Sequence, residues 1–179
     1  MMPELTDRSW SIRPARVTDA PNVLHYMQNL ARELDLFLPM VVEDFRLTVV
    51  DEEHIIARHE ARDNALALIA VTADDRVVGM WDCMGSTRPA LQHVVEFGMS
   101  VAREYRSQGV GAALLSAGLD WARQSPAVHR IELEVYAENR PAMRLYEKFG
   151  FAIEGRKQHA FYHHGRYHDS LIMALLLVQ

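Results

Sequence analysis

The stretch EYRSQGVGAALLSAG at residues 104–118 constrains the fold more than any other part of the chain. It places Gly109 and Gly111 at the start of a segment with helical periodicity, and it follows HVVEFGMSV at 93–101, which reads as a strand. The first N–H groups of a helix have no intrahelical partner, and glycine lets an anion approach the backbone closely. A strand, a polar loop, Gly-x-Gly and a helix therefore predict a bound phosphate, and more specifically a pyrophosphate.

Two other phosphate-binding motifs fit this stretch poorly. A P-loop needs a lysine directly after its last glycine, and neither Gly109 nor Gly111 is followed by one. A dinucleotide fingerprint has a third glycine where Leu114 stands, and it follows the first strand of a fold rather than a late one. The remaining pattern is Arg-x-x-Gly-x-Gly, which begins at Arg106, and Arg103 adds a further charged donor.

Hydrophobic periodicity along the whole chain predicts a mixed α/β sheet with helices on its faces. No internal repeat or Pro/Gly-rich linker divides the sequence, so a single domain over residues 1–179 is expected, with its core at 8–177. The expected strands are 10–16, the two halves of 65–85, 93–101, 129–137, 151–160 and 167–177, and the expected helices begin near 18 and cover 51–62, 109–123 and 139–150.

Composition and charge narrow the class of protein. The chain has no apolar run near the ~20 residues that span a bilayer, and its polar, acidic start is unlike a signal peptide. A net charge of −5 argues against a nucleic-acid partner and permits a cationic small molecule. Cys83 is the single cysteine, which favours a reducing compartment. We therefore expect a cytoplasmic protein that binds neither membrane nor nucleic acid.

The motif at Arg106 resembles the coenzyme A signature of the GNAT superfamily, the acetyl-coenzyme A-dependent N-acetyltransferases. HVVEFGMSVAREYRSQGVGAALL resembles the family's fourth strand and pyrophosphate loop, and IELEVYAENRPAMRLYEKFGF resembles its fifth strand and following helix. The tail EGRKQHAFYHHGRYHDSLIMALLL is similar to the ending of amino-acid and phosphinothricin-type acetyltransferases. The resemblance covers residues 10–177. It implies a mostly antiparallel sheet of about seven strands, splayed between strands four and five around acetyl-coenzyme A.

The resemblance also implies how the coenzyme is held. The pyrophosphate would lie on the loop and helix start, and the pantetheine arm would lie along the fourth strand. Gly98 interrupts that strand, which predicts a bulge or a close backbone approach, with a packing glycine facing Trp81 as the alternative. Asn139 is a helix cap by position and, by resemblance, also binds the arm. The predicted coenzyme-binding residues are Met99, Ser100, Val101, Arg106, Ser107, Gln108, Gly109, Val110, Gly111, Ala112, Asn139 and Ala142.

Tyr146 is the predicted general acid. It lies on the apolar stripe of the helix at 139–150, so core packing alone would account for it. The resemblance, however, places a tyrosine at this position beside the coenzyme sulfur. A phenol, whose unperturbed pKa is about 10, is suited to protonating a departing thiolate.

Glu96 and Glu134 are the predicted bases. Each interrupts an apolar strand, where a carboxylate without a role would be costly. An amine arrives as ammonium and must lose a proton before it attacks, and either glutamate, directly or through water, could take that proton. A solvent-facing or ion-paired strand residue is the alternative for each. Family members use positions that match either one, and Glu96 is favoured because it lies nearer the expected thioester.

No metal site and no covalent acyl intermediate are predicted. His159, His163, His164 and His168 flank a polar turn without the cysteine or carboxylate spacing of zinc sites, so they are expected on a surface hairpin. Cys83 lies in an apolar strand and is expected to be a buried residue rather than a nucleophile.

The sequence leaves the acetyl acceptor and the length of the acyl chain open. A small amine such as an amino acid, toxin or antibiotic is favoured by the resemblance of the tail. A protein N-terminus, which would need an open groove in residues 26–45, is the main rival. A non-catalytic acyl-coenzyme A sensor is a third class, although it would need neither an acid nor a base. The apolar run at 171–178 fits either a homodimer interface or a buried central strand.

Overall fold

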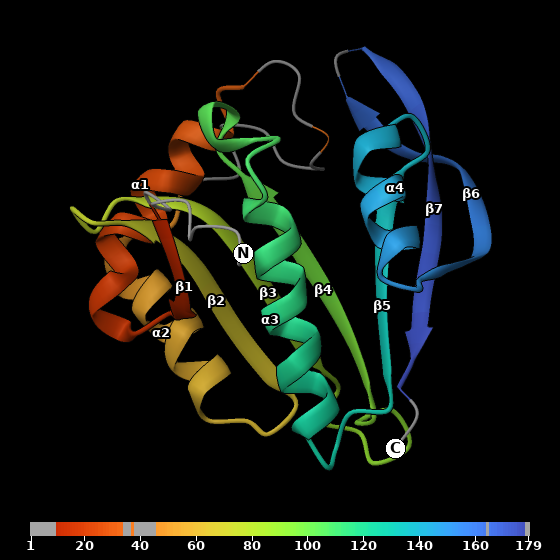
Figure 1. The fold of residues 1–179 in the computed structure, drawn as a ribbon, viewed down its shortest axis with the longest axis horizontal. Coiled ribbons are helices and arrows are strands. Elements are labelled where there is room, and N and C mark those ends of the chain that lie inside the picture. Colours follow the sequence, from red (N-terminus) through yellow and green to blue (C-terminus); the bar gives the residue numbers. More distant parts are fainter. Residues whose placement is uncertain (1–9, 34–36, 38–45, 164, 178–179) are drawn as a thin grey trace, which may run out of the picture.

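The computed structural model describes residues 10–33, 37, 46–163 and 165–177. Seven strands form one sheet in the order β1-β2-β3-β4-β5-β7-β6, in which only β4 and β5 are parallel neighbours (Figure 1). The strands are β1 Trp10–Pro14, β2 Ala65–Thr72, β3 Val77–Gly85, β4 Val94–Val101, β5 Arg130–Tyr136, β6 Ala152–His163 and β7 Arg166–Leu176. The helices are α1 Ala20–Leu30, α2 Val49–Glu60, α3 Val110–Gln124 and α4 Arg140–Lys148. The predicted fold class is confirmed.

Most element boundaries lie within two or three residues of the predicted ones. The first strand ends at Pro14 instead of residue 16, and a 3-10 turn at Val17–Asp19 precedes α1. Helix α2 begins at Val49 because Thr48 caps it: the N–H of Asp51 donates to Thr48 Oγ1 at 3.2 Å, and the N–H of Thr48 donates to the Asp51 carboxylate at 2.8 Å.

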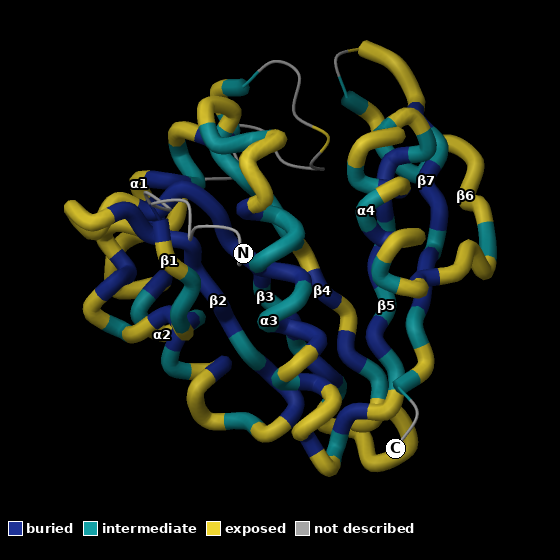
Figure 2. The backbone as a smooth tube through the Cα atoms, in the orientation of Figure 1, coloured by how far each residue is buried: buried dark blue, intermediate teal, exposed yellow. Residues whose placement is uncertain are grey.

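The two faces of the sheet carry different helices and different cores (Figures 1 and 2). One core joins α3 and α4 to inward residues of every strand from β1 to β5 and to β7, and Trp81 lies fully buried within it. The other core joins α1 and α2 to alternate residues of β2 and β3. Helix α3 packs so closely that a Cβ atom at Gly118 would lie 2.6 Å from the Trp81 ring. The sheet therefore has an α3–α4 face and an α1–α2 face.

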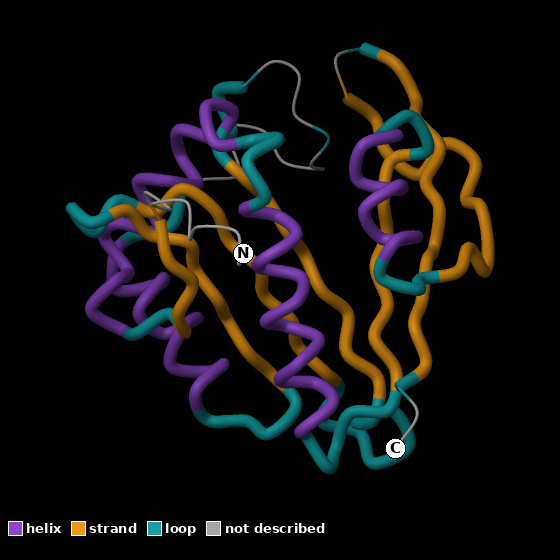
Figure 3. Tube along the Cα trace, viewed as in Figure 1, coloured by secondary structure: helices purple, strands orange, loops and turns teal. Residues whose placement is uncertain are grey.

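The sheet opens between β4 and β5. These strands pair over only three residues, from Val94↔Arg130 to Glu96↔Glu132, and then diverge (Figure 3). Strand β4 nevertheless stays paired with β3 as far as Val101, in an unbroken register. The predicted bulge at Gly98 is therefore wrong: the opening forms because β5 turns away, while β4 runs straight through Gly98.

Strand β7 contains the apolar run at 171–178 as far as Leu176 and lies between β5 and β6. Leu171, Met173 and Ala174 are buried there. Of the two predictions for this run, the buried central strand is therefore the one that the structure shows. The hairpin of β6 and β7 is also confirmed, but His168 is not on its surface. Its ring is 6% exposed and packs against Tyr136 at 5.4 Å. His164 lies outside the described residues.

Candidate active site

The first turn of α3 is open to an anion. Gly109 precedes it with φ 86°, a left-handed conformation that glycine adopts without strain, and Ser107 also has a positive φ of 59°. The first helical backbone bond runs from the N–H of Ala113 to the carbonyl of Gly109 at 3.0 Å. No side chain caps the helix, so three N–H groups remain without a partner among the described residues, those of Val110, Gly111 and Ala112.

A pocket of about 530 Å³ lies against the outer side of this helix start. It includes three of the predicted coenzyme-binding residues, Gln108, Gly109 and Ala112, and Trp10 and Phe149 contribute aromatic rings to its lining. The loop that leads into it is held by the Gln108 side chain, which donates to the carbonyl of Glu104 at 2.6 Å. The predicted pyrophosphate loop is thus accessible from the α3–α4 face.

The guanidinium of Arg106 is turned toward the end of α1. It forms an ion pair with Glu33, and its Nε donates to the carbonyl of Val101 at 2.9 Å. The backbone N–H of Arg103 donates to the same Glu33 carboxylate at 3.2 Å. These contacts make Arg106 a brace of the loop that precedes α3. Its direct contact with a phosphate stays a prediction, and Glu33 is a residue that the sequence did not single out.

The opening of the sheet exposes backbone groups of β4. The N–H of Ala102 donates to the carbonyl of Val78 on β3 at 2.9 Å. Since alternate residues of a strand direct their N–H groups to opposite neighbours, the N–H of Ser100 also faces β3, and those of Met99 and Val101 face the side that β5 has left. Of the three residues predicted to line the coenzyme arm on β4, Met99 and Val101 therefore have a backbone N–H group that faces the opening. The N–H group of Ser100 does not face it.

Ser100 instead contacts α1 through its side chain. The hydroxyl of Tyr26 donates to Ser100 Oγ at 2.8 Å, and Tyr26 itself is buried. Burial raises the pKa of Tyr26 above its ordinary value, although the hydrogen bond to Ser100 opposes the shift. This pair fixes α1 against the end of β4.

Tyr146 lies on α4 at the wall of the opening. Its ring is 6% exposed and packs edge-on against Phe97 at 5.8 Å, with Phe151 at 5.9 Å. Burial raises the pKa of Tyr146 to about 12. Its hydroxyl has no hydrogen-bond partner among the described residues. It is nevertheless not fully enclosed, because the enclosed polar side-chain atoms without a partner in these residues are His59 Nε2 and Trp81 Nε1. The hydroxyl therefore reaches space that the protein does not fill.

Asn139 caps α4 as predicted. Its Oδ1 accepts a hydrogen bond from the N–H of Ala142 at 3.2 Å, and Pro141 occupies the first turn. The side-chain NH2 group of Asn139 has no hydrogen-bond partner among the described residues, because only Oδ1 serves the cap. A role for Asn139 and Ala142 in binding the coenzyme arm stays a prediction.

Glu134 is engaged on both carboxylate oxygens. Lys157 Nζ lies 2.6 Å from Oε2, and Ser170 Oγ donates to Oε1 at 2.5 Å. Burial would raise the pKa of Glu134, but the hydrogen bonds from Lys157 and Ser170 outweigh it and lower that pKa. A carboxylate with a lowered pKa and no available oxygen is a weak base.

Glu96 has the opposite environment. It is exposed at the last β4–β5 pair, on the α1–α2 face of the sheet, and it forms no hydrogen bond or ion pair with any described residue. Glu96 and Tyr146 thus lie on opposite faces of the sheet at the point where it opens. An amine and a thioester could meet between them.

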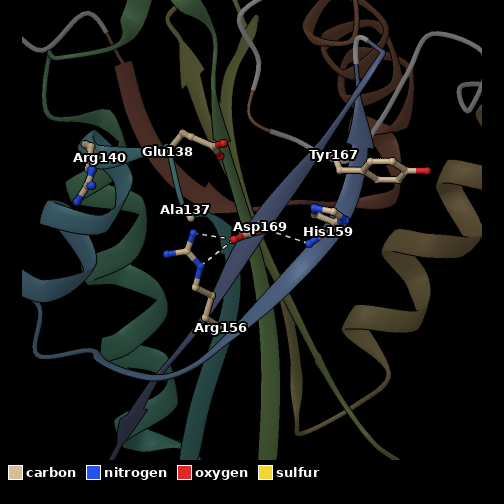
Figure 4. A pocket seen from close by; sticks show the side chains of 7 residues that line it. All are labelled: Ala137, Glu138, Arg140, Arg156, His159, Tyr167 and Asp169. Atoms are coloured by element: carbon tan, nitrogen blue, oxygen red, sulfur yellow. Dashed lines mark hydrogen bonds and ion pairs between the residues drawn. The ribbon is translucent and has the colours of Figure 1, made fainter.

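A second pocket, of about 490 Å³, lies beside the β5–α4 loop (Figure 4). Arg156 donates two hydrogen bonds to Asp169, and the backbone N–H of His159 donates to the other oxygen of that carboxylate at 2.9 Å. The bonds occur where β6 loses register with β7, and His159 has φ 52° there. None of the predicted site residues lines this pocket.

Neither Cys83 nor the described histidines of the β6–β7 hairpin form a nucleophilic or metal site. Cys83 is fully buried, and burial raises its pKa to about 12, which disfavours a thiolate. Within the described residues no group of three histidine, cysteine or acidic side chains is placed to hold a metal ion. Across the same ranges, no helix is both long and apolar enough to cross a bilayer.

The fold and this opening define an acyltransferase, and comparison with known proteins identifies the family. Residues 29–151 match the acetyltransferase (GNAT) family, so the chain belongs to that family. It is an N-acetyltransferase.

Two curated relatives act on small amines by their names. The L-amino acid N-acetyltransferase AaaT of Escherichia coli is 31% identical over 68% of this chain and 75% of its own length. The spermidine N(1)-acetyltransferase of Escherichia coli is 25% identical over 93% of this chain and 86% of its own. A structure from Salmonella typhimurium, solved with its cofactor acetyl-CoA, superimposes with a TM-score of 0.80 at 17% identity and covers 95% of both chains. That last likeness shows the fold alone.

Proposed function

We propose that the protein transfers an acetyl group from acetyl-coenzyme A directly to a primary amine of a small molecule, within a single domain over residues 1–179. The observation that carries the proposal is the opening of the sheet after Glu96, beside the uncapped start of α3. Acetyl-coenzyme A would supply an activated thioester. The described residues fit such a group, since the free N–H groups of α3 suit its pyrophosphate.

Backbone geometry supports a route for the coenzyme arm from α3 along β4. A Cβ atom at Gly111 would lie 3.6–3.7 Å from Leu145, Met99 and Val101, so this glycine borders the space between β4 and α4. The N–H groups of Met99 and Val101 face that side. One of them would stabilise the negative charge that develops on the thioester carbonyl oxygen.

The side chains divide the proton transfers between the two faces. On the α1–α2 face Glu96 would take the proton that the ammonium group loses, because its carboxylate is exposed and unpaired. On the α3–α4 face the Tyr146 hydroxyl would donate a proton to the sulfur as the C–S bond breaks. A phenol with a pKa of about 12 stays protonated throughout the physiological range. Both assignments follow from position and environment.

The names of the two relatives support a small amine over a protein N-terminus as the acceptor. The proposed sensor without activity has less support, since it would need neither a free Glu96 nor an unbonded Tyr146 hydroxyl. Cytoplasmic location and a homodimer stay predictions from the sequence.

The proposal is tested by measuring thiol release from acetyl-coenzyme A. The acceptors are free amino acids, polyamines, aminoglycosides, phosphinothricin and peptides with free N-termini. We expect saturable turnover with one class of small amine and none with peptides. Turnover restricted to peptides would establish the rival acceptor, and tight coenzyme binding without turnover on any amine would contradict the proposed activity.

A further inference from the structure

Asp82 borders an open space on the α1–α2 face of the sheet. It pairs directly with Gly98 across β3 and β4. A Cβ atom at Gly98 would meet a single described atom within 4 Å, Asp82 Oδ1 at 3.7 Å. Gly98 is exposed, and Glu96 lies two residues away on the same side of β4. The absence of a side chain at Gly98 therefore leaves room between two carboxylates, at the point where the sheet opens.

His59 on α2 lies behind Asp82. Its side chain is 6% exposed, and its Nδ1 lies 2.9 Å from the carbonyl of Ile55. A carbonyl can only accept, so Nδ1 carries a proton. The buried Nε2 has no hydrogen-bond partner among the described residues and lies 3.9 Å from Asp82 Oδ2. In the neutral ring Nε2 would turn a lone pair toward the carboxylate. An imidazolium at His59 would instead direct an N–H group toward Asp82 and hold the carboxylate in place.

The surroundings of this pair are acidic. Glu52 on α2 is 5% exposed, and burial and then the charge of Asp82 raise its pKa. Burial also raises the pKa of Asp82, while His59 lowers it. Arg58 on α2 places its Nη2 3.7 Å from Met84 Sδ on β3, and Lys157, the ion-pair partner of Glu134, is also attracted electrostatically by Glu96. Apart from the contact between Asp82 and His59, no described side chain forms an ion pair with Glu52, Asp82 or Glu96. A ligand cation would supply Asp82 with such a partner.

We propose that Asp82, positioned by His59, binds the ammonium form of the acceptor amine in the space above Gly98, beside Glu96. The inference rests on the proposed function and specifies which group of the acceptor is recognised: a primary alkylammonium ion. Asp82 would contact the ammonium group and hold it over the opening. His59 is a positioning residue, because it acts through Asp82.

The test measures amine binding without turnover. Spermidine, which carries primary ammonium groups, is titrated calorimetrically into protein saturated with coenzyme A. We expect Asp82→Asn to raise the Kd of spermidine at least about tenfold, which corresponds to about 1.4 kcal/mol. Asp63→Asn, an exposed change in the loop before β2, is the matched control and should leave the Kd unchanged. If the Kd of spermidine is the same for Asp82→Asn as for wild type, the proposal is overturned.

Gly98→Ala is a second variant that does not depend on removing a charge. Its new Cβ atom would make an ordinary contact at 3.7 Å, so the fold should persist, but the methyl group would occupy the proposed ammonium position. Weaker spermidine binding with an unchanged Kd for acetyl-coenzyme A would support the inference. Unchanged spermidine binding would contradict it.

His59→Gln tests the positioning role through the pH dependence of binding. Wild-type binding should weaken as acid protonates the Asp82 carboxylate. Since His59 lowers the pKa of Asp82, its removal should move this loss to higher pH. If spermidine binding depends on pH in the same way in wild type and His59→Gln, His59 has no positioning role. Thiol release by wild type is measured separately, so a failure of the proposed activity is distinguishable from a failure of this subsite.

Discussion

Arg106 and Glu33 form an ion pair that joins the loop before α3 to the end of α1. The same Glu33 carboxylate accepts a hydrogen bond from the backbone N–H of Arg103. A single acidic residue therefore sets the position of the segment that leads to the uncapped helix start. Its removal should disturb coenzyme binding more than the stability of the fold, because neither partner belongs to the two hydrophobic cores.

We expect Glu33→Gln to raise the Kd of acetyl-coenzyme A by about fivefold to tenfold, since charge-assisted hydrogen bonds contribute about 1.5–3 kcal/mol and part of this is recovered by the amide. Isothermal titration calorimetry measures the effect. Glu60→Gln, at an exposed position at the end of α2, is the control. Equal Kd values for the two variants would show that the brace has no bearing on the coenzyme.

Gly111→Ala separates folding from coenzyme binding. The new methyl group would lie at 3.6–3.7 Å from its neighbours, and alanine in a helix is favoured over glycine by about 0.5–1 kcal/mol. The free energy of unfolding should therefore be retained or increased. The methyl group would also enter the space between β4 and α4, so the Kd of acetyl-coenzyme A should rise by about tenfold or more. Urea unfolding and calorimetry measure the two effects, and unimpaired binding would place the coenzyme arm elsewhere.

Tyr146→Phe should lower kcat by about 10²–10⁴-fold, the range for loss of a general acid. The packing against Phe97 and Phe151 is retained, so the melting temperature should change little. Thiol release under saturating acceptor measures kcat. Tyr162→Phe, 66% exposed on β6, provides the control. If Tyr146→Phe kept its full rate, water or another group would have to protonate the sulfur.

Glu96→Gln and Glu134→Gln should differ in kind. The first should reduce kcat by about 10²-fold or more at neutral pH, because the proposed base is lost. The second should retain most of the rate but lose about 1–3 kcal/mol of stability, since the single amide oxygen of glutamine can replace only one of the two acceptors that serve Lys157 and Ser170. Rates and urea unfolding are measured for both variants. The reverse pattern would move the base to Glu134.

Asp19 should contribute to stability in a pH-dependent way. Arg13 donates to both of its carboxylate oxygens, at 2.6 and 2.8 Å. These hydrogen bonds lower the pKa of Asp19 despite partial burial. A lowered pKa means that the contribution is complete above the unfolded value of about 3.9 and is lost as the pH falls through the folded value.

Wild type should therefore lose up to about 1 kcal/mol more than Asp19→Asn between pH 6 and pH 3. Urea unfolding at both pH values measures the difference. Asp120→Asn removes an exposed pair with Arg123 and should track wild type within about 0.5 kcal/mol. Identical pH dependence in wild type and Asp19→Asn would show that the pair contributes nothing.

Local patterns predicted the order of strands and helices well, because caps and periodicity act over a few residues. Asn139 at the start of α4 and Gly109 before α3 are examples. Contacts between distant segments were not predictable in this way. Glu33 lies 73 residues from Arg106, and no local pattern marks it. Asp82 did carry a signal, since it is a charge within the apolar run VVGMWDCMG, the same argument that identified Glu96.

Gly98 illustrates a second limit. A glycine within a strand predicts a bulge or a close backbone approach, yet the pairing of β4 with β3 is continuous across it. Gly98 instead leaves space on one face of the sheet, and the use of that space depends on the residue paired with it on β3. Only the register between β3 and β4 reveals that Asp82 is the neighbour.

The boundary between β4 and β5 also divides the chain into two successive stretches. The strands on one side come from residues 10–101 and those on the other from residues 130–176 (Figure 1). During synthesis the ribosome releases the first stretch and α3 before β5 emerges, so β4 remains an unprotected edge until the later strands arrive. The larger core draws on both stretches and on α3, through Trp81 from the first, Leu114 from α3, and Leu133 and Met173 from the second. Closing the core and completing the site are thus one event, and a chain terminated after α3 would possess neither.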